Sequence, residues 1–225
     1  MFIGHFGVGF GAKSVDKKIS LGTLLLASQF IDLLWPILLL LGLESVKVDP
    51  GNTAVTPLNF ISYPISHSMF SVIIWGVLFG IVYYLIKKNL RGSILLGGLV
   101  FSHWLLDLMT HRPDLQLFPW SDYKVGLGLW NSFYGTVIVE GLIFAVGVFI
   151  FYKIKKLQSK SKKILFWSLV IFLAAIYVMN LVGPPPPSEE PIAIMGLSQW
   201  LLIAWAYWID RSDKTTPQTS VKTDA

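Results

Sequence analysis

Histidine and aspartate recur at every fourth residue in one apolar stretch of this chain, at His103, Asp107 and His111. On an α-helix this spacing places the three side chains on one stripe, with about 6 Å of axial rise between neighbours. Neighbouring members could chelate one metal ion, whereas His103 and His111 are about 12 Å apart along the axis and too distant to share one. Two interpretations follow: Asp107 bridges two ions, or one histidine moves a proton or contacts a substrate.

Any transition-metal site in this chain must use nitrogen and oxygen donors, because the sequence contains no cysteine. Such a donor set suits Zn first, with Mn or Fe as alternatives. Counted along the apolar stretches, Asp32 is expected at the same membrane depth as His103. His67 precedes the next apolar stretch, on the outer side together with His111. Asp32 and His67 are therefore further candidate ligands.

His5 lies in a stretch too short to cross a membrane. It can approach the other histidines only if residues 1–12 fold back among the helices. Small residues permit such close backbone approach, and this stretch contains Gly4, Gly7, Gly9 and Gly11. The alternative is that His5 stays on the cytoplasmic side, away from the site.

Each of these residues also has a simpler interpretation. A single intramembrane histidine or aspartate more often makes a hydrogen bond between helices than it binds a metal. The pairing of His103 with Asp107 favours function, because an uncompensated charge inside a span is costly. Glu140 also lies in an apolar stretch, but the sequence shows no partner for it.

The elements that position these residues are predicted to be transmembrane helices. Of the 225 residues, 54% are hydrophobic and only 14% are charged, whereas soluble domains carry roughly 25% charged residues. Stretches of about 20 apolar residues are long enough to span the hydrocarbon, where backbone groups must be satisfied internally. The predicted fold class is therefore all-α, a polytopic transmembrane helical bundle. About six spans are expected, near residues 19–43, 69–86, 93–110, 132–152, 164–182 and 192–209.

Basic residues predict the orientation of this bundle. With the N-terminus inside, 15 of the 18 Lys and Arg residues fall in cytoplasmic segments, and the outer loops hold only Lys47, Arg112 and Lys124. This positive-inside bias predicts that both termini are cytoplasmic. The net charge of +5 then indicates contact with the lipid bilayer and not with nucleic acid. Residues 1–210 are expected to form one membrane domain, and residues 211–225 a polar, disordered tail.

Four short motifs resemble a known family. They are Gly4-His5-Phe6-Gly7, Gln29-Phe30-Ile31-Asp32, His67-Ser68 and the segment from Ser102 to Thr110. Together, over roughly the first 130 residues, they resemble the YdjM-like bacterial inner-membrane proteins, which are described as membrane-bound, metal-dependent hydrolases. That family looks like a dispersed version of the zinc-dependent phospholipase C ligand set. This chain departs from it in one respect, because Gln29 and a single Asp32 stand where the family often has a proline and two aspartates, which weakens the case for two metals.

The resemblance implies a set of metal ligands, namely His5, Asp32, His67, His103 and Asp107. It also implies hydrolysis of an ester or phosphoester, with a lipid substrate favoured by a site near the outer half of the bilayer. His111 or Asp114 could then handle protons, and Arg112 could hold an anionic headgroup or phosphate. The metal would be Zn first, with Mn or Fe as alternatives.

Two other classes of function remain open. The same buried groups could form a proton or cation relay in a transporter, which Glu140 favours and the lack of visible internal repeats disfavours. A non-catalytic membrane assembly protein would also accommodate them. The sequence does not predict the oligomeric state.

Overall fold

The computed structural model describes residues 1–157 and 159–210, and the predicted polar tail 211–225 lies outside the described residues. The described helices are α1 Ile3–Gly11, α2 Leu21–Ser28, α3 Phe30–Leu40, α4 Pro64–His67, α5 Met69–Lys87, α6 Leu90–Thr110, α7 Phe133–Ile154, α8 Lys160–Val182 and α9 Glu189–Asp210. Short 3-10 turns lie at η1 Ala12–Ser14 and η2 Leu129–Asn131.

The prediction of an all-α polytopic bundle is confirmed. Within the described ranges, five helices are long and apolar enough to cross a membrane, namely α5, α6, α7, α8 and α9. A sixth span is the pair α2 and α3, which is bent by 55°. The bend at Gln29 differs from the single helix expected over residues 19–43. The cytoplasmic placement of the termini stays a prediction.

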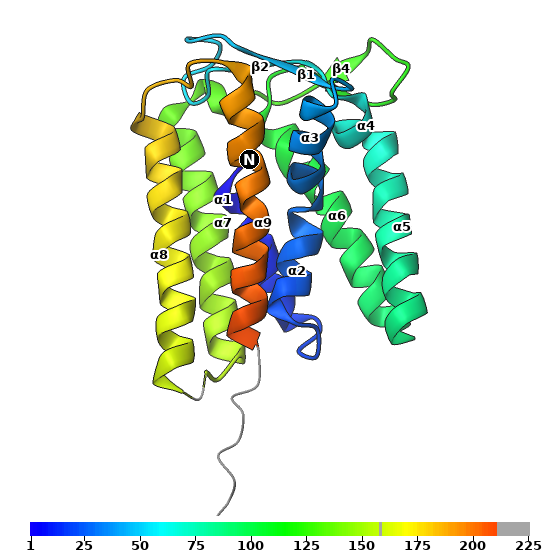
Figure 1. Cartoon of the computed structure of the whole chain (residues 1–225), viewed down its shortest axis with the longest axis vertical. Coiled ribbons are helices and arrows are strands. Elements are labelled where there is room, and N and C mark those ends of the chain that lie inside the picture. The colour runs from blue at the N-terminus through cyan, green and yellow to red at the C-terminus, as the bar shows by residue number, and fades with distance from the viewer. Residues whose placement is uncertain (158, 211–225) are drawn as a thin grey trace, which may run out of the picture.

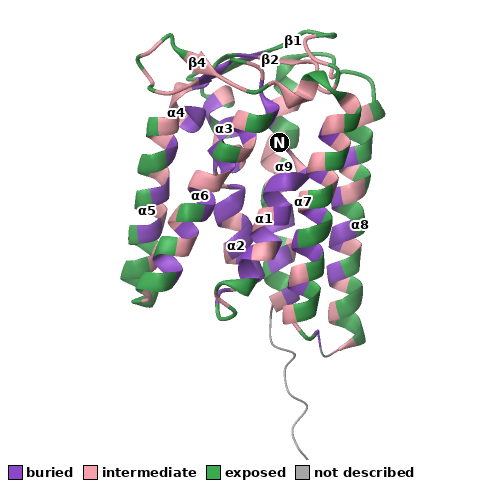
Figure 2. Ribbon diagram, turned by 180° about the vertical axis from the view of Figure 1, so that it is seen from behind, coloured by how far each residue is buried: buried purple, intermediate pink, exposed green. Residues whose placement is uncertain are grey.

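The helices form two outer groups with a third group between them (Figure 1). Helices α7 and α8 stand on one side and the hairpin of α5 and α6 on the other, with α2, α3 and α9 between them. Helix α5 exposes most of its apolar side chains, as expected of a helix that faces lipid (Figure 2). The exposed hydrophobic side chains of α5 therefore form part of the surface that faces lipid.

Five of the helices begin directly after a polar residue that caps them. In each case the side chain of the residue before the helix accepts a hydrogen bond from the backbone N–H three residues later, which satisfies one of the unpaired donors at the helix start. The capping residues are Ser20 for α2, Ser68 for α5, Asn89 for α6, Ser132 for α7 and Ser159 for α8.

Helix α1 lies inside the bundle, where it contacts α7, α2 and α6. Its nine residues reach only about 14 Å, too short to span the hydrocarbon. A Cβ atom on Gly147 of α7 would collide with the backbone of Gly7, and one on Gly7 would collide with the backbone of Ile143. The two glycines therefore allow the backbones of α1 and α7 to touch, as small residues do in membrane helix pairs. Residues 1–12 therefore fold back among the helices, and His5 lies buried inside the bundle and not on the cytoplasmic side.

Short strands cover one end of the bundle (Figure 1). Strand β1 Ser45–Val48 pairs antiparallel with β2 Leu58–Ser62, and β3 Leu115–Gln116 pairs with β4 Lys124–Val125. The sequence predicted loops at these positions. The strands were not predicted because none exceeds five residues, and an alternating pattern that short carries little signal. The covered end is the one that holds the polar site.

Candidate metal centre

Five side chains named by the resemblance converge at one place in the bundle. His5 comes from α1, Asp32 from the first turn of α3, His67 from the end of α4, and both His103 and Asp107 from α6. The three histidines and Asp107 are at most 3% exposed, whereas the side chain of Asp32 keeps 22% of its surface exposed. Water or a substrate can therefore reach the group on the side of Asp32.

Two imidazole nitrogens lie close to the same two carboxylate oxygens. The Nε2 atom of His103 lies 3.5 Å from Asp32 Oδ1 and 3.2 Å from Asp107 Oδ2. The Nε2 atom of His67 lies 3.7 Å and 3.8 Å from the same two oxygens. In a tetrahedral site with metal bonds of about 2.0 to 2.2 Å, neighbouring donors lie about 3.3 to 3.6 Å apart. The four imidazole-to-carboxylate distances are close to this spacing, and Asp32, His67 and His103 together form one group of three possible ligands.

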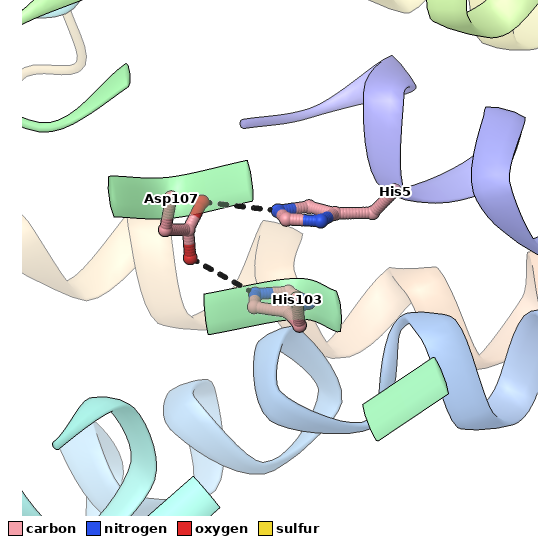
Figure 3. Close-up of side chains that lie close together, drawn as sticks. All are labelled: His5, His103 and Asp107. Carbon is pink, nitrogen blue, oxygen red and sulfur yellow. Dashed lines mark hydrogen bonds and ion pairs between the residues drawn. The ribbon is translucent and has the colours of Figure 1, made fainter. Parts of the chain in front are cut away.

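His5 contacts the opposite oxygen of Asp107 (Figure 3). Its Nε2 atom lies 3.1 Å from Asp107 Oδ1, and its ring stacks on that of His103 with 3.6 Å between ring centroids. Residues His5, His103 and Asp107 form a second group of possible ligands, which shares His103 with the group of Asp32 and His67. Two roles are compatible with this position: His5 orients Asp107 from behind, or Asp107 bridges to a second ion.

The bend between α2 and α3 fixes the tautomer of His103. At the end of α2 the carbonyl of Ser28 lies 3.0 Å from His103 Nδ1, and carbonyls at a helix end are free to accept bonds from outside the helix. A carbonyl only accepts, so Nδ1 carries a proton and donates to Ser28. The Nε2 atom faces the carboxylates of Asp32 and Asp107, where it would donate as an imidazolium or, in the neutral ring, offer its lone pair to a metal.

A carboxylate and a hydroxyl fix the tautomer of His67 in the same way. The Ser66 hydroxyl donates to Glu44 Oε2 at 2.6 Å and lies 2.7 Å from His67 Nδ1, so Nδ1–H donates to Ser66 and Nε2 faces the aspartates. Glu44, only 4% exposed, also accepts the backbone N–H groups of Ile65 and Ser66 at the start of α4. Such outer contacts orient metal ligands and raise their basicity.

Glu140 holds the start of α1 beside this centre. Buried in α7, it accepts the backbone N–H of Phe2 at 2.9 Å. The amino nitrogen of Met1 lies 2.5 Å from Asp107 Oδ1. Glu140, which has no partner evident in the sequence, thus positions the segment that carries His5.

A separate polar group lies just beyond α6. Asp114 Oδ1 accepts the Tyr63 hydroxyl at 2.7 Å and lies 2.9 Å from His111 Nδ1. Burial, followed by the neighbouring Asp114 carboxylate, raises the pKa of the Tyr63 phenol well above its usual value. Burial also lowers the pKa of the His111 imidazole, which keeps it neutral. Among the described residues, no hydrogen bond or ion pair joins His111 or Asp114 to the five candidate ligands. The Tyr63 ring contacts both sides, with 6.1 Å between its centroid and that of His111 and 5.2 Å to that of His67.

Arg112 faces a cleft next to this outer group. Its Nε atom lies 3.4 Å from Asp114 Oδ2, and its Nη2 donates to Asn59 Oδ1 at 2.5 Å. With Lys124 these side chains line an open cleft of about 480 Å³. Sequence reasoning missed Glu44, Tyr63 and Ser66, whose partners lie between 21 and 51 residues away.

The fold and this site define a class, a polytopic α-helical membrane protein with a buried His and Asp cluster near one end of its helices. The chain belongs to the YdjM inner membrane protein family, whose sequence model matches residues 48–185, and it is a multi-pass inner-membrane protein. The matched region includes His67, His103 and Asp107 and excludes His5 and Asp32. The motifs that resemble the family cover a different range, roughly residues 1–130. No curated protein and no solved structure shows significant similarity to the chain.

Proposed function

We propose that this protein is a metal-dependent hydrolase that cleaves an ester or phosphoester near the outer half of the bilayer. The observation that carries the proposal is the clustering of two imidazole nitrogens and two carboxylate oxygens at 3.2 to 3.8 Å from one another across each imidazole–carboxylate pair. Of these residues, Asp32, His67 and His103 form one group of three possible metal ligands, and Asp107 joins His103 and His5 in a second. Carboxylates in a membrane interior need positive charge nearby. The amino group of Met1 and the imidazoles pair with them here, and a divalent cation would supply that charge on the side where Asp32 and Asp107 face His67 and His103.

The donor chemistry fits a first-row divalent metal. Nitrogen and oxygen donors without sulfur suit Zn first, with Mn or Fe as alternatives. Asp32, His67, His103 and Asp107 would hold the ion, and His5 would orient Asp107 or contribute to a second ion. When bound, such a cation lowers the pKa of a water molecule and polarises the scissile group.

Residues of the outer group would complete the chemistry. Asp114 orients His111 through Nδ1, which leaves the opposite ring nitrogen able to take or give a proton. Arg112 presents a guanidinium to the cleft, where it could hold an anionic group of the substrate. A lipid is the favoured substrate, because the cluster lies at the end of membrane-spanning helices and Asp32 leaves it open on one side.

The test combines metal content with turnover. We expect detergent-purified wild type to retain near-stoichiometric Zn, Mn or Fe by elemental mass spectrometry, and to hydrolyse members of a panel of carboxyl esters, phosphoesters and phospholipids. His111→Ala should retain the ion but lose about 10²- to 10⁴-fold in turnover, the usual contribution of a general acid or base. Wild type that binds no metal after reconstitution with each ion would contradict the proposal and favour a proton relay or an assembly role.

A further inference from the structure

A second polar feature lies at the opposite end of the bundle from the metal centre. It is a cleft of about 680 Å³ between the loop after α1 and the turn that joins α5 to α6. Four cations line it, Lys17 and Lys18 from the loop, and Lys87 and Arg91 from the ends of α5 and α6. Within residues 1–157 and 159–210, none of these four forms an ion pair. Their charges are therefore available to a ligand.

The single carboxylate of this cleft is already occupied. Asp16 accepts the backbone N–H of Lys18 at 2.9 Å through Oδ1 and the Asn89 side-chain amide at 3.4 Å through Oδ2. Arg91 Nη2 donates to the carbonyl of Val15 at 2.8 Å. These bonds tie the loop to the helix turn, so the walls of the cleft are held together without neutralising its lysines.

Exposed apolar side chains lie near the cleft in sequence, on the ends of α5 and α6. Leu85, Ile86, Leu90 and Ile94 flank the α5 to α6 turn and are 60–69% exposed. The ends of membrane-spanning helices lie at the level of the lipid headgroups, where clustered Lys and Arg attract anionic lipids. A ligand with an anionic head and an apolar body matches both surfaces at once.

We propose that this cleft binds the phosphate-bearing headgroup of an anionic membrane phospholipid, with its acyl chains along α5 and α6. This site is separate from the metal centre and does not depend on hydrolysis. Its ligand is a bound lipid and not a substrate, because the one carboxylate that lines the cleft, Asp16, is already hydrogen-bonded to Lys18 and Asn89 and no histidine is among the described residues that line it.

The experiment measures binding of fluorescent phosphatidylglycerol and phosphatidylcholine to the purified full-length protein in mild detergent at physiological salt. The cleft variant combines Lys17→Gln, Lys18→Gln and Lys87→Gln. The matched control combines Lys156→Gln, Lys160→Gln and Lys163→Gln, which removes the same charge from exposed lysines near the α7 to α8 connection. Metal content and thermal unfolding of both variants should equal those of wild type, since all six side chains are exposed.

We expect wild type to prefer phosphatidylglycerol and the cleft variant to bind it roughly 10- to 100-fold more weakly, because each basic residue near the surface contributes about a tenfold or smaller factor. The control should change affinity less than threefold. Equal losses in both variants would overturn the proposal in favour of diffuse surface attraction. Displacement of the lipid by glycerol phosphate at equal concentration would overturn it as well, because the site would then recognise a free phosphate.

Discussion

The metal centre and the outer group of Tyr63, His111 and Asp114 use the same residue types in opposite ways. In the outer group the donors and acceptors satisfy one another through hydrogen bonds of 2.7 to 2.9 Å. In the metal centre the imidazole and carboxylate atoms face each other at 3.2 to 3.8 Å, and their outer atoms are held by other groups. The difference teaches that burial and residue type alone do not distinguish a candidate metal site from a hydrogen-bonded group, and that the spacing between the polar atoms does.

The largest expected effect distinguishes Asp107 in the candidate metal centre from Asp114 in the outer group. Asp107→Asn should reduce Zn affinity at least 100-fold, because a carboxylate ligand is lost from the centre and the neutral amide attracts the cation weakly. Competition with a fluorescent chelator measures the affinity. Asp114→Asn is the matched control and should change it less than threefold. Equal effects of the two substitutions would erase the distinction between the two groups.

A second prediction concerns the support of His67. Glu44→Gln weakens the bond that Ser66 donates and should lower metal affinity roughly 10- to 100-fold, the usual cost of removing an outer partner of a ligand. The same chelator competition measures it, with exposed Glu190→Gln as the control. An unchanged affinity would show that the bonds of Glu44 serve only to begin α4.

A third prediction tests how α1 is held. Glu140→Gln replaces the carboxylate that accepts the Phe2 N–H and should lower metal affinity roughly threefold to tenfold, since α1 positions His5 beside Asp107. His5→Gln alone should have a similar effect. The double variant should lose little more than either single one, because residues that act through one contact are not additive. Additive losses would mean that Glu140 acts independently of His5.

The smallest expected effect on bound metal lies in the outer group. Tyr63→Phe removes the hydrogen bond to Asp114 and should cost about 1 to 3 kcal/mol of stability, because a buried carboxylate loses a donor. Thermal unfolding measures this change, and metal content should stay that of wild type. A loss of bound metal would show that the outer group is coupled to the centre through the contact between Tyr63 and His67.

Sequence alone predicted the spans well, because apolar length and the need for internal hydrogen bonds leave helices as the only solution. Predicted and observed helices differ by about four residues or fewer at their ends for α5 to α9. The bend at Gln29 was not predicted. The Ser28 carbonyl beside it meets His103 Nδ1, 75 residues away on α6, and no local pattern shows such a contact.

The candidate site was predicted as a set of residues and not as a geometry. The spacing of His103 and Asp107 placed them on one stripe, and the resemblance added His5, Asp32 and His67. The contacts of Glu44 with Ser66 and of Glu140 with Phe2 join segments that are distant in sequence, and no local pattern encodes such contacts. Ion binding by these residues remains a prediction.

The most direct test of the central claim is X-ray absorption spectroscopy of the zinc-loaded protein. The account predicts a first shell of nitrogen and oxygen at about 2.0 to 2.2 Å, with the outer-shell scattering of two imidazoles from His67 and His103. The histidine signal should fall in His103→Ala and persist in His111→Ala. A first shell of oxygen alone, or a histidine signal that disappears only in His111→Ala, would contradict the account.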